Sequence, residues 1–209
     1  MIKNIVFDWS GVINDNFELV YNVAMAMFIE FGTEKISVEE FREEFVLPYM
    51  IFYNKYMPNL SLKDEQEAYV RLYKKLSLQY PSDAYPNIKE TLIKFKDSGI
   101  NMNIISSDHK ITALKEMERF EMQDMFKSII IGVLDKSESI KKVIRDNSYN
   151  PKETIFIGDM EHEIEAGKKA GTLTAGVTWG FNTEDKLRSA NPDYIIHNLE
   201  ELEQIILGK

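Results

Sequence analysis

The chain has 209 residues, enough for one ordinary domain or for a core with a modest insertion. Hydrophobic residues make up 44% and charged residues 28% of the sequence, which is typical of a globular protein with a full core. The formal net charge of −9 argues against a nucleic-acid partner, because proteins that bind the phosphate backbone present a basic face.

The sequence predicts no membrane partner and no disulfide framework. No stretch approaches the roughly 20 uncharged apolar residues of a membrane-spanning helix. The opening letters MIKNIVFD lack the long apolar segment and cleavage site of a signal peptide. Because the chain has no cysteine, we expect a cytoplasmic protein without a thiolate metal site. The composition is compatible with either a monomer or a homodimer.

The first predicted element is a strand, NIVFD (residues 4–8), which is followed at once by a glycine turn. The next part of the chain shows no strand pattern and predicts three helical segments. One covers residues 16–31, and another begins at Ser37 with Glu40 three residues later, the spacing of a capping box. The third begins near residue 61 and ends before residue 81.

After about residue 85, predicted strands and helices alternate. The strands are near-continuous apolar runs at residues 102–107, 128–132, 154–159, 173–179 and 193–198. Helical patterns occupy residues 88–95, 137–145, 161–170 and 199–207. Alternating strands and helices predict βαβ units and a parallel sheet covered on both faces. The predicted fold is therefore an α/β core, residues 1–13 and 83–209, with an inserted α-helical cap at residues 14–82.

Polar side chains follow four of the predicted strands. Asp8, Ser106 and Asp159 lie at strand ends, and the pair Asp135 and Lys136 follows another strand closely. Ligands of an open parallel sheet bind beyond the carboxyl ends of its strands. A carboxylate there can attack phosphorus, two carboxylates can hold Mg²⁺, and a lysine and a hydroxyl can orient a phosphoryl group. The pattern therefore indicates a phosphoryl-transfer site.

Four segments, FDWSGV, IISSD, Lys136 and FIGDMEHE, resemble in this order the four motifs of the haloacid dehalogenase superfamily of hydrolases. The tail AGVTWGFNTEDKLRSANPDYIIHNLEEL is similar to that of its phosphoglycolate-phosphatase-like branch. The cap matches only as a helical insertion of suitable position and size. The resemblance implies a Rossmann-like core, a small phosphorylated metabolite as substrate, and a cap that closes over the site.

The resemblance also implies roles for the side chains that handle the phosphoryl group. Asp8 would be the nucleophile and would form an aspartyl-phosphate intermediate. Ser106 would donate a hydrogen bond to the phosphoryl group, with Ser107 as the alternative if the strand ends one residue later. Lys136 would balance the negative charge on Asp8 and on the phosphoryl group.

The same resemblance implies Mg²⁺ as the cofactor. Its ligands would be the carboxylate of Asp8, the main-chain carbonyl of Ser10 and the carboxylate of Asp159, with Glu163 behind them. The family usually has aspartate at the position of Glu163, and glutamate remains an oxygen donor with one more carbon.

Ser10 is the main departure from the family pattern. Phosphatases of the family have an aspartate there, which protonates the leaving group and then activates water. General acid–base catalysis contributes about 10²- to 10⁴-fold, so Ser10 predicts slow turnover unless another group substitutes. Asp108 and His109 are candidates, although a helix N-cap aspartate followed by an exposed histidine is the simpler interpretation.

Two alternatives to a phosphatase follow from Ser10. One is a catalytically weak or inactive binding protein of the same fold. The other is a phosphonate hydrolase, because DWSG is similar to the Asp-Trp-Ala-Gly-Thr of enzymes that cleave carbon–phosphorus bonds. Those enzymes need a cap lysine that forms a Schiff base, and Lys55 is the candidate. A nearby aromatic stripe at helical spacing, Tyr49, Phe52, Tyr53 and Tyr56, is more typical of packing than of a substrate cradle.

Overall fold

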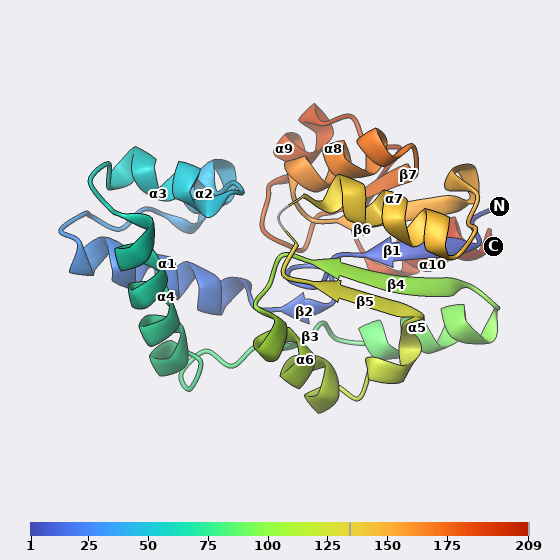
Figure 1. Ribbon diagram of the computed structural model, residues 1–209, viewed down its shortest axis with the longest axis horizontal. Helices are drawn as coiled ribbons and strands as arrows, with labels where there is room; N and C mark the ends of the chain where they lie inside the picture. Colours follow the sequence, from blue (N-terminus) through green and yellow to red (C-terminus); the bar gives the residue numbers. More distant parts are fainter. Residues whose placement is uncertain (134, 209) are drawn as a thin grey trace. The chain divides into compact units, whose positions relative to one another are not determined.

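The computed structural model describes residues 1–133 and 135–208, which divide into two compact units (Figure 1). The sheet unit comprises Met1–Asp15 and the chain from Asp83 onward, and the helical unit comprises Asn16–Ser82. Among the described residues, no helix has the length and apolar character needed to cross a membrane.

The sheet unit is built on six strands that are all parallel to their neighbours. The strands are β1 (Asn4–Phe7), β4 (Asn101–Ser106), β5 (Ser128–Ile131), β6 (Thr154–Gly158), β7 (Leu173–Val177) and β8 (Tyr194–Ile196). Their order in the sheet is β5-β4-β1-β6-β7-β8, so the predicted α/β fold with a parallel sheet is confirmed. The chain turns outward in opposite directions from β1 and β6, which makes their shared carboxyl end the switch point of the sheet.

Helices cover both faces of this sheet (Figure 1). They are α5 (Ile88–Asp97), α6 (Lys110–Arg119), α7 (Lys136–Asp146), α8 (Glu161–Ala170), α9 (Glu184–Ser189) and α10 (Leu199–Leu207), with short 3₁₀ turns at Gln123–Met125 and Pro151–Glu153. Successive side chains of a strand point to opposite faces. Ile5 and Phe7 accordingly pack in the core that includes α5 and α6, whereas Val6 packs in the core that includes α7 and α8.

The helical unit contains α1 (Phe17–Glu30), α2 (Val38–Glu44), α3 (Tyr49–Tyr56) and α4 (Leu62–Leu76). Side-chain caps start two of them: the hydroxyl of Ser37 accepts from the Glu40 amide at 3.1 Å, and that of Ser61 from the Asp64 amide at 3.1 Å. The prediction of three helical segments was wrong in one respect, because the second is split into α2 and α3. Pro48 lies at the break, where it lacks an N–H for helical bonding and disfavours helix in the residue before it.

The core of the helical unit is largely aromatic. Phe52 and Tyr53 are buried, and the Phe52 ring contacts Phe28 at 5.7 Å and Phe41 at 5.3 Å between centroids. Aromatic pairs of this kind contribute about 0.5–1.5 kcal/mol each beyond their buried area. This arrangement supports packing as the role of the aromatic stripe in α3.

The two chain segments that join the units form a small antiparallel ladder. Asn14 pairs with Ala84 and Asp15 pairs with Asp83, in strands β2 (Asn14–Asp15) and β3 (Asp83–Ala84). The sequence gives no signal for this pair because two residues are too few to show a strand pattern.

Candidate active site

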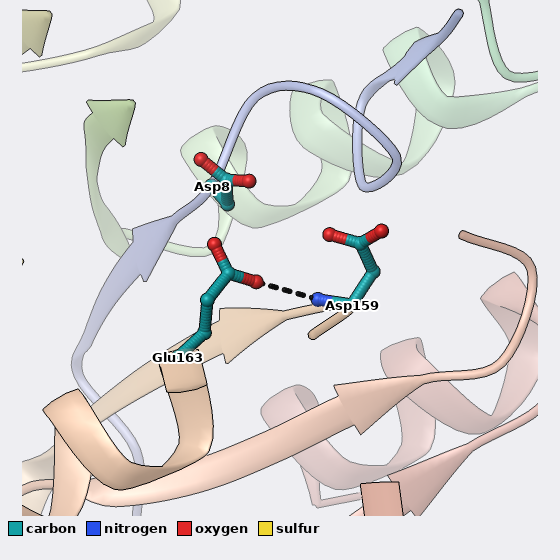
Figure 2. A group of neighbouring side chains, drawn as sticks. All are labelled: Asp8, Asp159 and Glu163. Carbon is teal, nitrogen blue, oxygen red and sulfur yellow. Dashed lines mark hydrogen bonds between the residues drawn. The ribbon is translucent and has the colours of Figure 1, made fainter. Parts of the chain in front are cut away.

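Three buried carboxylates gather at the carboxyl ends of β1 and β6 (Figure 2). Asp8 follows β1, Asp159 follows β6, and Glu163 lies in the first turn of α8. Each residue is at most 5% exposed, and one oxygen of each lies within 4.8 Å of the others. The main-chain amide of Asp8 donates to the carbonyl of Ile157 at 2.9 Å, so sheet hydrogen bonding continues up to Asp8 itself.

A tight turn follows Asp8 and packs against Asp159. Gly11 adopts φ +75°, and its amide donates to the Asn14 carbonyl at 2.8 Å. A Cβ on Gly11 would lie 2.2 Å from Oδ2 of Asp159, so only glycine satisfies both the backbone conformation and the close approach. The glycine therefore brings the segment after Asp8 directly onto the second carboxylate.

A second loop holds Asp159 from the other side. The amide of Phe181 donates to Oδ2 of Asp159 at 2.6 Å, and a Cβ on Gly180 would lie 2.3 Å from Asp159 side-chain atoms. Oδ1 of Asp159 is buried and has no hydrogen-bond partner among the described residues. The contact of this loop with Asp159 could not be predicted from the sequence, because a backbone donor leaves no side-chain signal. The Thr-Trp-Gly turn just before Phe181 is the one feature that marks the loop.

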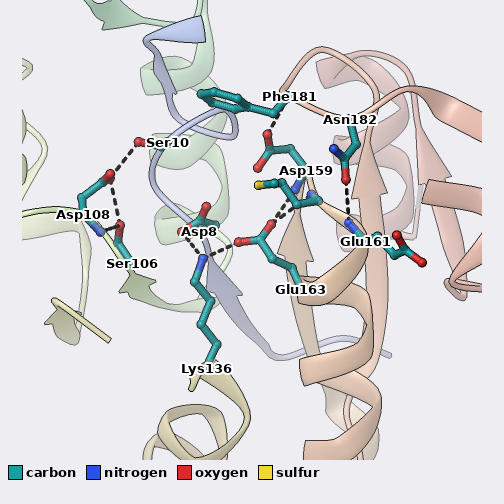
Figure 3. A network of polar contacts seen from close by, with 11 residues as sticks. Asp8, Ser10, Ser106, Asp108, Lys136, Asp159, Glu161, Glu163, Phe181 and Asn182 are labelled. Atoms are coloured by element: carbon teal, nitrogen blue, oxygen red, sulfur yellow. Dashed lines mark hydrogen bonds and ion pairs between the residues drawn. The ribbon is translucent and has the colours of Figure 1, made fainter. Parts of the chain in front are cut away.

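Lys136 links two of the carboxylates (Figure 3). Its Nζ lies 2.7 Å from Oδ1 of Asp8 and also forms an ion pair with Oε1 of Glu163. The other oxygen of Glu163 accepts from the amides of Asp159 at 2.8 Å and Met160 at 3.2 Å. Both Glu163 oxygens are thus engaged by protein groups, whereas Asp159 keeps one oxygen available.

Burial and mutual repulsion shape the protonation of this cluster. Burial, followed by the charge of Glu163, raises the pKa of Asp8 to about 7 against the opposing effect of Lys136. Burial and the charges of Glu163 and Asp8 raise the pKa of Asp159 well above its ordinary value. For Lys136, burial disfavours the charge, but Asp8 and Glu163 outweigh it and raise the pKa. The two carboxylates therefore favour the charged form of Lys136.

The donor set suits a hard divalent cation. Three carboxylates and one ammonium group leave a net negative charge in a buried site when all are ionised. The unpartnered Oδ1 of Asp159 is an oxygen donor of the type that Mg²⁺ prefers. The residues present therefore fit the predicted metal.

A second polar cluster joins the ends of β1 and β4 (Figure 3). Oδ2 of Asp108 accepts from the hydroxyl of Ser10 at 2.7 Å and from the hydroxyl of Ser106 at 2.9 Å. The amide of Asp108 donates back to the Ser106 hydroxyl at 3.1 Å. β4 ends at Ser106, which is buried, whereas Ser107 lies just beyond the strand and is half-buried.

Asp108 does not cap the helix that follows it. The N-cap of α6 is His109, which is exposed, so the interpretation of Asp108 as the N-cap aspartate was wrong. Burial, with a contribution from the charge of Asp8, raises the pKa of Asp108, although the hydroxyls of Ser10 and Ser106 oppose this. The sequence placed Asp108 among the candidates but held no sign of its bond to Ser10, which lies 98 residues away in the chain.

Lys55 belongs to the helical unit and is a surface residue. Its side chain is 53% exposed, and its Nζ pairs with Oε2 of Glu44 at 2.5 Å. A lysine that forms a Schiff base is activated by a desolvated pocket or by a neighbouring cation. Among the described residues, the exposed Lys55 has neither form of activation, and its ion-pair partner is the carboxylate of Glu44; this weighs against phosphonate hydrolysis.

A parallel sheet with buried carboxylates, a lysine and a serine at its switch point is the arrangement that the resemblance to a family of hydrolases predicted. Residues 5–177 match the model of the haloacid dehalogenase-like hydrolase family. The chain therefore belongs to the haloacid dehalogenase-like hydrolases.

Individual relatives match over almost the whole chain. A phosphoglycolate phosphatase of Aquifex aeolicus is 27% identical, over 98% of this chain and 97% of its own length. A pyrophosphatase, PpaX, of Listeria monocytogenes is 26% identical, over 98% and 96%.

Solved structures show the same fold. A putative phosphoglycolate phosphatase from Lactobacillus delbrueckii superposes with a TM-score of 0.81 at 17% identity, covering 99% of both chains. A haloacid dehalogenase-like hydrolase from Streptococcus pneumoniae gives a TM-score of 0.79 at 23% identity, covering 96% of both chains.

Proposed function

We propose that this protein is a Mg²⁺-dependent phosphatase that hydrolyses a small phosphorylated metabolite through an aspartyl phosphate on Asp8. The observation that carries the proposal is the buried Asp8 carboxylate at the switch point, with the Lys136 ammonium 2.7 Å away. The names of the relatives, phosphoglycolate phosphatase and pyrophosphatase, support a phosphate compound as the substrate. Residues 14–82 would serve as a cap domain.

In this proposal the metal is held by Asp8, Asp159 and the main-chain carbonyl of Ser10. When bound, Mg²⁺ would neutralise charge on the phosphoryl oxygens. Glu163 would act mainly by holding Lys136 and the backbone at Asp159. One of its oxygens accepts from Nζ of Lys136, and the other accepts from the amides of Asp159 and Met160.

The chemical steps follow from the placement of the side chains. A carboxylate oxygen of Asp8 bonds to phosphorus while the bond from phosphorus to the leaving oxygen breaks. Ser106 and Lys136 orient the phosphoryl group and balance its charge. Water then attacks phosphorus and releases phosphate, which restores the free carboxylate of Asp8.

Asp108 is the group that we propose in place of the acid/base aspartate. It would give a proton to the leaving oxygen in the first step and recover one from water in the second. Its hydrogen bond to the Ser10 hydroxyl supports this role. Asp108, in the connection from β4 to α6, places a carboxylate beside Ser10, the position at which phosphatases of the family have their acid/base aspartate. The raised pKa of Asp108 also favours the protonated form that a general acid needs.

The test is phosphate release from a panel of small phosphomonoesters with Mg²⁺. Asp8→Asn should abolish release and trapping of the phosphoenzyme. Asp108→Asn should lower kcat/KM by about 10²- to 10⁴-fold, and by less for aryl phosphates whose leaving group needs no proton. Ser107→Ala, at the adjacent half-buried position, is the matched control and should stay near wild type.

Two results would contradict the proposal in different ways. Full activity in Asp108→Asn would remove Asp108 from the mechanism while leaving the phosphatase intact. If neither wild type nor Asp8→Asn releases phosphate from any compound of the panel, the alternative of a phosphate-binding protein is favoured. Ser10 is the observation that motivates this alternative. In that case, phosphate binding by wild type without Asp8 phosphorylation should be detected by calorimetry.

A further inference from the structure

Glu116 is a buried carboxylate that the proposed chemistry does not use. It lies on α6 and is 8% exposed. Its Oε2 accepts two hydrogen bonds, from Nε1 of Trp9 at 3.0 Å and from Nδ2 of Asn14 at 3.1 Å. These donors are more than a hundred residues away in the chain, so the contacts join α6 to the segment after β1.

Trp9 and Asn14 are the two ends of the turn that follows Asp8. The carbonyl of Trp9 accepts from the amides of Ile13 at 3.0 Å and Asn14 at 2.9 Å, which closes the turn. The indole of Trp9 is fully buried and stacks on Phe120 at 5.7 Å, also adjacent to α6. One oxygen of Glu116 thus fixes both ends of the turn to a single helix.

The position of this turn decides where the reacting groups lie. Asp8 directly precedes Trp9, and Gly11, inside the turn, leaves no room for a Cβ against Asp159. The amide of Asp8 is held by the Ile157 carbonyl at 2.9 Å, so a shift of the turn acts on the carbonyl side of Asp8 and changes how its carboxylate faces Asp159. Misplacement of a reacting group by about 1 Å can cost about 10²-fold in rate.

We propose that Glu116 is a positioning residue that holds Asp8 in register with Asp159 by anchoring Trp9 and Asn14. The inference rests on the proposed function, since it concerns the rate of attack by Asp8. A charged acceptor suits the role, because hydrogen bonds to a carboxylate are stronger than those to a neutral oxygen. Glu116 itself contacts neither the substrate nor the metal in this account.

The test compares three variants with wild type by kcat, KM and thermal unfolding on the most active phosphomonoester. Glu116→Ala should lower kcat about 10²-fold with KM unchanged, because binding groups stay in place while the nucleophile is displaced. Glu116→Gln keeps an oxygen acceptor of the same shape and should recover kcat to within about tenfold of wild type. Trp9→Phe keeps the ring but removes the donor, and its kcat should fall between those of the two Glu116 variants.

Indole NMR gives a reading that is independent of activity. The chain has two tryptophans, so a ¹⁵N-labelled sample gives two indole N–H signals, and the Trp9 signal should move in Glu116→Ala and Glu116→Gln. If Glu116→Ala keeps wild-type kcat while remaining folded at the assay temperature, the positioning role is overturned and the phosphatase proposal stands. The role is also overturned if Glu116→Gln is as slow as Glu116→Ala. Wild-type protein that releases no phosphate overturns the proposed function, and the positioning role with it.

Discussion

Glu65 in α4 offers a sharp test of the electrostatics of the helical unit. The residue is 2% exposed, and its Oε2 has no hydrogen-bond partner among the described residues. Burial raises the pKa of Glu65 from the ordinary 4.5 to about 7. The charge of Glu65 in turn contributes, after burial, to raising the pKa of Tyr53. We predict that Glu65→Gln stabilises the helical unit at alkaline pH.

The sign and size follow from linkage between protonation and folding. Between pH 4.5 and about 7 the unfolded chain has lost the Glu65 proton while the folded protein keeps it, so the free energy of unfolding falls as pH rises. Each unit of pKa difference corresponds to about 1.4 kcal/mol, so the whole difference sets an upper limit of about 3 kcal/mol. The loss is complete above pH 7. Glutamine has no such proton, so Glu65→Gln should gain up to about 3 kcal/mol over wild type at pH 8 and little at pH 4.5.

Hydrogen exchange of peptides from α3 and α4, corrected for intrinsic rates, measures this free energy for the helical unit alone. We expect protection in wild type to fall from pH 5 to pH 8, and protection in Glu65→Gln to stay constant. Glu67→Gln is the control, because Glu67 lies on the same helix with its side chain 69% exposed. Equal pH dependence in wild type and Glu65→Gln would refute the reasoning.

Three further predictions concern the sheet unit. Gly11→Ala should destabilise the protein by more than about 1 kcal/mol and abolish phosphate release, because it combines φ +75° with a Cβ 2.2 Å from Asp159; thermal unfolding and the phosphate assay report the two effects. Lys136→Met should lower the free energy of unfolding in urea at pH 8 by about 3–5 kcal/mol, because it leaves the buried Asp8 charge without its partner. Lys142→Met, at an exposed ion pair, should lower it by at most about 1 kcal/mol. Similar losses in the two variants would contradict this reasoning. Mg²⁺ at a hundred times its Kd should increase the free energy of unfolding of wild type by about 2.7 kcal/mol, which is measured as a higher melting temperature. Asp159→Asn should lose most of this increase. An equal increase in Asp159→Asn would exclude that carboxylate as a ligand.

The positions of the strands and of the polar residues at their ends could be predicted from the sequence, because both follow from the order of apolar and polar residues along the chain. The sheet strands were located because buried parallel strands are continuous apolar runs. The neighbourhood of Asp8, Ser106, Lys136 and Asp159 could be predicted because the carboxyl ends of parallel strands meet at one edge. The roles of these residues in catalysis remain predictions.

The features that were missed depend on distant contacts or on the backbone. The Phe181 amide that holds Asp159 is a group that every residue except proline possesses, so no letter marks it. The bond between Ser10 and Asp108 requires two strand ends to meet at a known register. The break before α3 has a signal in the sequence, because Pro48, the N-cap of α3, lies between Ser37 and the third predicted segment and interrupts helical hydrogen bonding.

The ladder of β2 and β3 determines how the helical unit can be removed from the chain. Asp15 and Asp83 are paired across it, so the points where the chain leaves and re-enters the sheet unit are neighbours. Antiparallel strands that end side by side can be joined by a hairpin loop of two residues. Residues 16–82 are therefore attached like a domain insertion: they can be excised and replaced by a short turn without rerouting any strand of the sheet. The same ladder can therefore accept a different insert in place of residues 16–82.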